Sequence, residues 1–463
     1  MKNRQTSPAA SSARSSARPS TRSLATSLAV LGAVLVPGVA LAQDPPPEAP
    51  AAEPAPAPAA EAPAEPPPAE APPAEPAPAA EPVVEEAPAE EAPPAEKPFE
   101  PSFTIGAGMR TGLDLNFDPG TLTLSDGLVD QINVRPFMGG SLTPMIGYWV
   151  QFEIGSGLDA ANGTTASFLP AFNVLDAIAQ LKFMDELQLW VGQHIPAGDR
   201  NNMNGPFFGN NWNFATVAGG YPFDVGARDR GFTLWGLVAG GKFKYKLSMV
   251  DLQPGRQIGQ SRFGARADLH LWKPEAFYYN SGTYFGGQDI LTIGASVQGQ
   301  SGDEAVADDD LVGFNIDGMF EKNFGKGGTL TAEAGYYNFD NTGAAYASNQ
   351  GTSDLGGGVG SGGSGFGALG VGGGGVGEGF LGALSWLTPG KVGIGQIQPN
   401  AKFQYGDYGG NTTAVIDLGV AYVVDGFNHK YHLNYRHAQA GPTGGASAGD
   451  DSIQLGFQYM MAK

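Results

Sequence analysis

Cysteine is absent from the 463-residue chain, so disulfides and thiol chemistry are excluded. Long apolar runs are also missing: after residue 42 no stretch of 18 apolar residues occurs, so no transmembrane helix is expected there. Basic residues are scarce, since 26 Lys and Arg face 46 Asp and Glu and leave a net charge of -20. Such an acidic chain is a poor candidate for binding nucleic acid, whose phosphates need a basic face. If the chain spans a membrane, it does so as a β-barrel.

The first 42 residues have the organisation of an export signal. Five basic residues and no acidic ones lie in the first 22 positions, and "LATSLAVLGAVLVPGVALA" follows, closing on Ala40-Leu41-Ala42. A basic segment, an apolar segment and a small-residue site predict a signal peptide over 1–42. The alternative is an uncleaved inner-membrane anchor, against which Pro37 and the small-residue site argue. We therefore expect an exported protein.

Residues 43–98 are almost entirely Pro, Ala and Glu, as in "EAPAEPPPAEAPPAEPAPAAEP". The segment has almost nothing to bury and too many prolines for a helix, which predicts a disordered, semi-extended linker. Its 13 acidic residues and one Lys give it a charge of -12. It could contact the cell wall, but no binding module is recognisable, and a passive periplasmic tether is the preferred interpretation.

From Phe103 onward the pattern has period two. In "SFTIGAGMRTGLDLNF" the odd positions are apolar with one exception, Thr111, and the even positions are polar or Gly, as in a strand with one lipid-facing and one polar face. About sixteen such stretches occur, at roughly 102–117, 129–138, 145–156, 171–183, 186–195, 227–239, 242–252, 262–272, 277–298, 311–323, 328–339, 379–387, 392–406, 413–424, 430–439 and 451–461.

The connections between these stretches sort by parity. Those that leave even-numbered strands are short ("SLTP", "MDE", "GG", "KPEA", "GKGG", "TPGK", "DGFNHK"), whereas most that leave odd-numbered strands are longer. This pattern is typical of an outer-membrane barrel with both ends in the periplasm. Soluble sandwiches do not sort their turns in this way and rarely need sixteen strands. The predicted fold class is all-β, a transmembrane antiparallel barrel of about sixteen strands over 99–463.

Enzyme signatures are weak throughout. "GASAG" (445–449) lies between two strands with no helix after it, and "GVGSGG" (358–363) falls in a glycine-rich loop, so neither match predicts catalysis. His432 and His437 differ by five positions and would face opposite sides of a strand. We expect no enzyme, no cofactor and no metal site. One alternative is that Asp308–Asp310 hold a divalent cation near lipopolysaccharide rather than forming a plain solvated loop.

Basic residues gather in one part of the barrel. Nine of the 20 that follow position 98 lie between Arg228 and Lys273. Charges on the lipid side of a strand cost several kcal/mol at bilayer depth, so those that share the polar face of two neighbouring strands should face the lumen. These five residues, which we call the basic stripe, are Lys242, Lys244, Lys246, Arg262 and Arg266. They predict a path for small anions; alternatively, they are ordinary polar positions of a lumen wall.

Two segments, "NVLDAIAQLKFMDELQLWVGQHIPAGD" and "ARDRGFTLWG", resemble the phosphate-selective porin (O/P type) family. The matching positions are Asp176-Ala177, Gly192-Gln193 with Pro196, and Arg228/Arg230-Gly231. His194-Ile195 stand where that family tends to have an aromatic-Lys pair. The resemblance covers about 70 residues and implies a sixteen-stranded, usually trimeric barrel that passes anions through a basic channel.

The loop from Pro196 to about Gly226 is rich in Asn and aromatic residues, so we expect it to fold against the barrel wall or into the lumen. Residues in and beside this loop are then candidates for a constriction or a loop anchor: His194, Asp199, Arg200, Arg228 and Arg230.

The sequence as a whole predicts a porin of a Gram-negative outer membrane, in contact with outer-membrane lipid and lipopolysaccharide. It would let small solutes diffuse passively, with a preference for anions such as phosphate. Two alternatives stay open. One is a non-conducting barrel with an attachment or envelope-architecture role, and the other is a soluble secreted glycan-binding β-protein.

Overall fold

The computed structural model of the chain describes residues 99–117, 124–156, 170–215, 217–218, 227–251, 261–300, 311–341, 377–408 and 410–463. The predicted signal peptide, the predicted linker and the acidic run Asp308–Asp310 lie outside these residues. Within the described part no helix is long and apolar enough to cross a bilayer.

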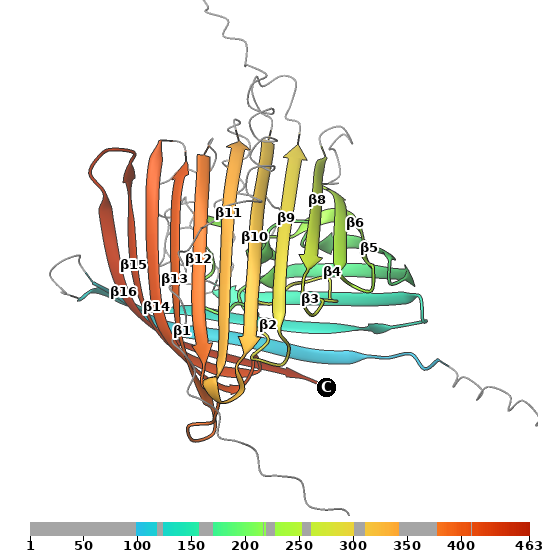
Figure 1. Ribbon diagram of the computed structural model, residues 1–463, viewed down its shortest axis with the longest axis horizontal. Helices are drawn as coiled ribbons and strands as arrows, with labels where there is room; N and C mark the ends of the chain where they lie inside the picture. Colours follow the sequence, from blue (N-terminus) through green and yellow to red (C-terminus); the bar gives the residue numbers. More distant parts are fainter. Residues whose placement is uncertain are drawn as a thin grey trace, which may run out of the picture. The chain divides into compact units, whose positions relative to one another are not determined.

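Sixteen strands close into a single antiparallel barrel in which each strand pairs with its neighbours in sequence and β1 pairs with β16 (Figure 1). The predicted fold class is therefore confirmed. The strands are β1 (Thr104–Phe117), β2 (Leu124–Ser141), β3 (Ile146–Ser156), β4 (Pro170–Met184), β5 (Leu187–His194), β6 (Asp229–Val238), β7 (Phe243–Val250), β8 (Arg262–His270), β9 (Ile290–Gln300), β10 (Leu311–Asn323), β11 (Thr329–Asn341), β12 (Gly377–Leu387), β13 (Gln396–Tyr408), β14 (Asn411–Asp425), β15 (His429–Pro442) and β16 (Ala448–Ala462).

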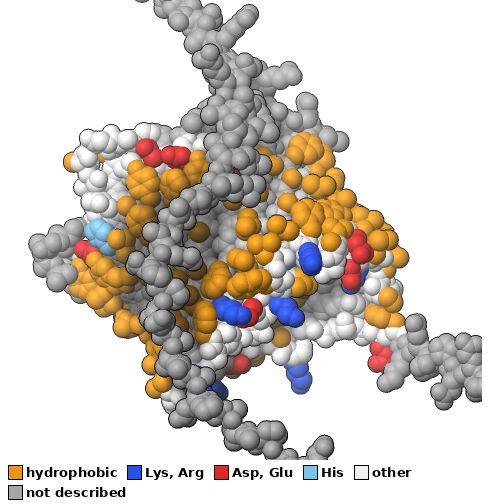
Figure 2. Space-filling model, in the orientation of Figure 1, with side chains coloured by type: hydrophobic (Ala, Val, Ile, Leu, Met, Phe, Trp, Pro, Cys, Tyr) orange, Lys and Arg blue, Asp and Glu red, His pale blue; other side chains and the backbone are white. Residues whose placement is uncertain are grey.

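The alternation in the sequence sets which side chains face out. Apolar residues such as Ile293, Val297 and Leu418 are about half exposed on the outer wall, while the polar residues between them are buried inside. Figure 2 shows apolar side chains spread over the described surface and only small groups of charged ones. A lipid-facing apolar band around a polar interior is the arrangement that a bilayer demands of a barrel.

The seam between the first and last strands is fully paired. β1 and β16 are in register from Gly106 opposite Ala462 to Phe117 opposite Asp451. Beyond that ladder the amide of Ile105 donates to the carbonyl of Lys463 (3.1 Å), and the amide of Lys463 donates to the carbonyl of Ile105 (2.8 Å). The barrel consequently has no open edge strand at this position.

The prediction for the ninth strand is wrong in its first half. The sequence pattern placed it at 277–298 after a short "KPEA" turn, but β8 ends at His270 and β9 begins at Ile290. The nineteen residues Leu271–Asp289 form a connection that folds into the barrel. Its aromatic residues resemble a strand pattern, but Tyr278 and Tyr279 pack on Trp190 of β5 from inside the barrel and are not part of the wall. The connection from β13 to β14 is the opposite exception. It leaves an odd-numbered strand and was expected to be long, yet only positions 409 and 410 separate the two strands.

The remaining connections that leave even-numbered strands are short, as expected, and those of β3, β5 and β11 are long. By the rule for outer-membrane barrels, the short turns face the periplasm and the long loops face the outside. In intact cells, a thiol label should therefore reach a cysteine introduced between residues 342 and 376 but not one placed in the Gly325–Gly328 turn. Equal labelling at both positions would contradict this orientation; labelling after cell lysis serves as the control.

Candidate functional site

The connection between β5 and β6 enters the barrel interior and runs across it. Near its start, Ala197 is held by the wall, since its amide donates to Ser248 Oγ (2.7 Å) and its carbonyl accepts from Gln298 Nε2 (2.8 Å). Further along, Asn210 Nδ2 donates to Ser385 Oγ of β12 (2.6 Å) and Asn211 Nδ2 to Asn400 Oδ1 of β13 (2.8 Å). The segment thus joins walls as distant in strand order as β7 and β13. This confirms the expected inward fold for its described part.

A short helix, α2 (Arg200–Asn204), forms the first turn of this crossing segment. Asp199 caps it, because its side chain accepts from the amides of Asn201 (2.9 Å) and Asn202 (3.2 Å). The same carboxylate accepts from the hydroxyl of Tyr337 on β11 (3.1 Å). Burial, together with the nearby carboxylate of Asp317, raises the pKa of Asp199 to about 6.

The β8–β9 connection, Leu271–Asp289, meets this segment from the end of the barrel where the short turns lie. The amide of Gly282 donates to the carbonyl of Phe208 (2.8 Å). The hydroxyl of Tyr278 donates to the carbonyl of Ile195 (2.8 Å), and the ring of Tyr278 stacks on Trp190 with centroids 4.0 Å apart. Two inserted segments from opposite ends of the barrel therefore contact each other inside the lumen.

An ion pair between Arg200 and Glu275 joins the two inserted segments. Arg200 Nη1 donates to Glu275 Oε2 (2.8 Å) and Arg200 Nη2 to Glu275 Oε1 (2.7 Å), and both side chains are buried. Burial alone would raise the pKa of Glu275, but the charge and hydrogen bonds of Arg200 outweigh it and lower that pKa to about 2. Bidentate pairs of this kind fix geometry as well as charge.

Most of the basic stripe lies on the inner wall but is covered. Lys244 and Lys246 are fully buried, and each ammonium lies 3.8 Å from Asp268. Arg266 contacts both Asp268 (2.6 Å) and Asp317 (2.7 Å).

The β8–β9 connection covers the two lysines. Lys244 Nζ donates to the carbonyls of Glu275 and Phe277, at 3.0 Å each. Arg262 pairs with Asp229 (2.6 Å). Lys242 lies outside β7, exposed in the turn that precedes it, so the stripe on the wall consists of four residues and not five.

The residues that carry the porin resemblance come together on β4, β5 and β6. Arg228 pairs with Asp176 (3.2 Å), and Arg230 Nε donates to Gln193 Oε1 (3.3 Å). Arg230 is exposed on the outer face, with the parity of Phe232, and does not line the lumen. His194 is buried against the wall, where Nε2 contacts Thr233 Oγ1 at 2.6 Å.

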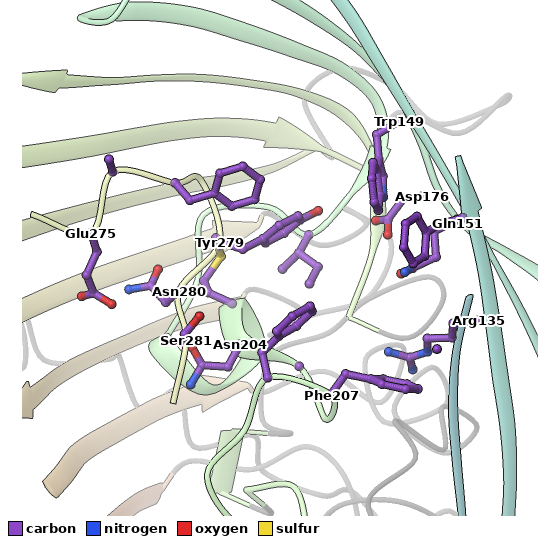
Figure 3. A pocket seen from close by; sticks show the side chains of 18 of the residues that line it. Arg135, Trp149, Gln151, Asp176, Asn204, Phe207, Glu275, Tyr279, Asn280 and Ser281 are labelled. Atoms are coloured by element: carbon purple, nitrogen blue, oxygen red, sulfur yellow. The ribbon is translucent and has the colours of Figure 1, made fainter. Parts of the chain in front are cut away.

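A cavity of about 590 Å³ lies between the inserted segments and the wall of β1 to β5 (Figure 3). Figure 3 shows Trp149, Gln151 and Asp176 on one side of it and Asn204, Asn280 and Ser281 on the other. Trp149 lies near the start of β3, where aromatic residues of a barrel often form a girdle at the lipid interface, but it does not face lipid. Its ring faces inward and stacks on Phe137, with centroids 4.9 Å apart.

Charge inside the described barrel is balanced. Eleven Lys and Arg and eleven Asp and Glu are buried there. Glu275, Asp317 and Asp268 neutralise buried basic residues, since Glu275 pairs with Arg200 and both aspartates pair with Arg266. Only Asp268 was visible from the sequence, because it shares the face of Arg266 on β8. For the inserted connection the available signal was five aromatic residues within "FYYNSGTYF", which begins three positions after Pro274.

A closed sixteen-stranded barrel with an apolar outer face, a polar inner face and an inserted loop is the fold of the outer-membrane porins. In the described residues no group of His, Cys, Asp and Glu has an arrangement that could hold a metal ion.

No family model matches the chain, and no curated protein matches it. The resemblance to the phosphate-selective porin family therefore stays a prediction. Among solved structures, the chain is similar to a loop L8 deletion mutant of OmpT, an outer membrane protein of Vibrio cholerae (9% identity, TM-score 0.47, 78% of this chain and 99% of that one). It is also similar to an anion-selective porin from Comamonas acidovorans (14%, 0.44, 78% and 100%) and to the outer membrane channel DcaP of Acinetobacter baumannii (12%, 0.45, 78% and 97%).

Proposed function

We propose that the protein is an outer-membrane pore through which small solutes diffuse passively. The observation that carries this proposal is the closed barrel with an apolar outer wall and a polar, hollowed interior. A barrel that served only for attachment would not need a cavity of this size beside its inserted segments. A soluble glycan-binding protein would not expose an apolar band such as Ile293, Val297, Phe403 and Leu418.

The finer part of the proposal concerns anions. The basic stripe would favour small anions such as phosphate wherever its charge reaches the solute path. In the structure the β8–β9 connection is docked, that is, it lies inside the barrel against Lys244. Lys244, Lys246 and Arg266 are paired there with Asp268 and Asp317, so the electric field of each pair falls off quickly with distance. We therefore propose low charge selectivity while the β8–β9 connection is docked, and anion preference when that connection leaves the stripe.

Reversal potentials in a planar bilayer test this proposal. The purified protein should form ohmic channels, and in a salt gradient the potential should lie close to zero or slightly on the anion side. Changing Asp268 to Asn removes one negative charge that the lysines share, so the potential should move toward anion preference. Absence of conductance would overturn the pore proposal, while clear cation preference of the wild type would overturn only the proposal on anions.

The setting of the pore is proposed as well. We place residues 1–42 as the export signal and 43–98 as a periplasmic linker, with the barrel in the outer membrane among lipid and lipopolysaccharide. A homotrimer is the proposed assembly, as the porin resemblance implies.

A further inference from the structure

The cavity between the inserted segments and the β1–β5 wall has the chemistry of a binding site. Its volume, about 590 Å³, lies within the range of about 300–1,000 Å³ typical of small-molecule sites. It lies toward the end of the barrel where the short turns lie, because residues of the β8–β9 connection line it together with Trp149 of β3 and Trp190 of β5. Solutes that diffuse through the barrel would therefore meet it on the periplasmic side of the crossing segment.

Each charged side chain that lines the cavity already has a partner of opposite sign. Arg135 pairs with Glu153 at 2.9 Å and Arg228 with Asp176 at 3.2 Å. Glu275 pairs with Arg200 at 2.7 Å. A charged solute would have to disrupt one of these pairs or enter without a counter-charge. The site is consequently matched to a neutral solute.

Two amide side chains are buried at the cavity with atoms that lack partners. Among the described residues, neither Asn204 Oδ1 nor Asn280 Nδ2 has a hydrogen-bond partner, and both side chains are more than nine-tenths buried. A buried polar atom without a partner destabilises the structure, so a ligand that satisfies it gains affinity. One atom accepts and the other donates, which suits a hydroxyl group, since a hydroxyl does both.

Aromatic rings form the rest of the wall. Trp149, Phe207 and Tyr279 border the same space and come from β3, from the crossing segment and from the β8–β9 connection (Figure 3). A pyranose ring presents C–H bonds on its faces and hydroxyls around its rim. The aromatic side chains can stack on the C–H faces of such a ring, and the unpaired amide atoms of Asn204 and Asn280 can bond its hydroxyls.

We infer that this cavity binds neutral sugars, and that these are among the solutes that the proposed pore admits. The inference rests on the proposed function only for permeation; binding itself does not require conduction. Trp149 supplies the stacking surface, and Asn204 and Asn280 supply the hydrogen bonds to hydroxyls.

Glucose, glucuronate and glucosamine share one ring and differ in charge, so they serve as probes. Glucose should block the ion current in planar bilayers in a saturable way, and calorimetry on the detergent-folded protein should detect its binding. Both charged sugars should bind more weakly. Trp149→Ala should weaken glucose binding by about three- to tenfold, the range expected for one aromatic contact. Trp386→Ala, on the lipid-facing side of β12, should leave it unchanged.

Asn204→Ala gives an independent test, because Asn204 Oδ1 bonds nothing in the described chain and its loss should not disturb folding. Weaker glucose binding in this variant supports the inference. Tighter binding of glucuronate than of glucose, no glucose binding, or equal binding by wild type, Trp149→Ala and Asn204→Ala would overturn it. Glucose binding by calorimetry without any conductance would overturn the proposed pore and leave the site standing.

Discussion

Replacing Glu275 with Gln is expected to release the β8–β9 connection from the lumen and to produce larger, noisier single-channel currents. The change leaves Arg200 fully buried without its counter-charge. Removing one partner of a buried ion pair costs about 3–5 kcal/mol, which is roughly a hundredfold or more in the docking equilibrium. The connection should then spend part of its time away from the crossing segment, and each departure should appear as a step in current.

The matched control is Asp289→Asn. Asp289 lies in the same connection and forms an ion pair with Lys322, but both side chains are about a third or more exposed. Solvent screens an exposed pair, which contributes little to stability, so this variant should conduct like the wild type. Identical currents from Glu275→Gln, Asp289→Asn and the wild type would show that the buried pair does not hold the connection in place.

The wild type should show the same transition on acidification. The pKa of Glu275 is lowered in the folded protein to about 2, because Arg200, Lys244 and the hydroxyl of Tyr284 face it and outweigh the effect of burial. Because the pKa of Glu275 is lower in the docked state, its ion pair stabilises docking fully at pH values above about 4.5, the pKa of the unpaired carboxyl. This stabilisation is lost progressively as the pH falls toward 2. Current noise should rise in that window in the wild type, and in Glu275→Gln it should be present at neutral pH already.

Replacing Gly192 with Ala should prevent the barrel from folding. Gly192 on β5 has a φ of 125°, a conformation that residues with a side chain rarely adopt. A Cβ atom there would lie 2.0 Å from the carbonyl oxygen of Ala177 on β4, a backbone atom that cannot move aside without breaking the ladder. Strain and clash together should reduce the heat-modifiable, folded band on gels to a small fraction of the wild-type level.

Gly382→Ala is the control for the Gly192 variant. Gly382 also lies within a strand, β12, but a Cβ atom there would have no heavy atom within 4 Å. This variant should fold like the wild type, and Ala is slightly favoured over Gly in a strand. Normal folding of Gly192→Ala would mean that β4 and β5 can separate locally at little cost.

The strands and the inward-facing charges could be predicted from the sequence because both depend on local alternation. A residue at position 244 or 266 faces the lumen whatever the rest of the chain does, provided that its neighbours at 243 and 265 face lipid. The inserted segments obey no such rule. Arg200 and Glu275 are 75 positions apart, and their pairing depends on both connections turning inward and meeting. No local pattern contains that information.

The same limit explains why the ninth strand was predicted wrongly and why the inward direction of the Trp149 ring could not be predicted. Phe277, Tyr278 and Tyr279 have the composition of a strand end, yet Tyr278 and Tyr279 pack against Trp190 of β5 inside the barrel. Trp149 follows Tyr148 directly, so only one of the two can face lipid. An aromatic residue at the bilayer interface and an aromatic residue at a lumen cavity look alike in a sequence.

The paired seam between β1 and β16 has a consequence for the order of assembly. Gln454 donates to Asp114 across this seam, 340 positions away in the chain. Every other strand pair joins neighbours in sequence and can form as a hairpin, whereas this pair must close the longest loop in the barrel. Closure of the ring is then the slowest pairing and the last one, and until it occurs two complete strand edges remain available to the machinery or the lipid that receives the chain.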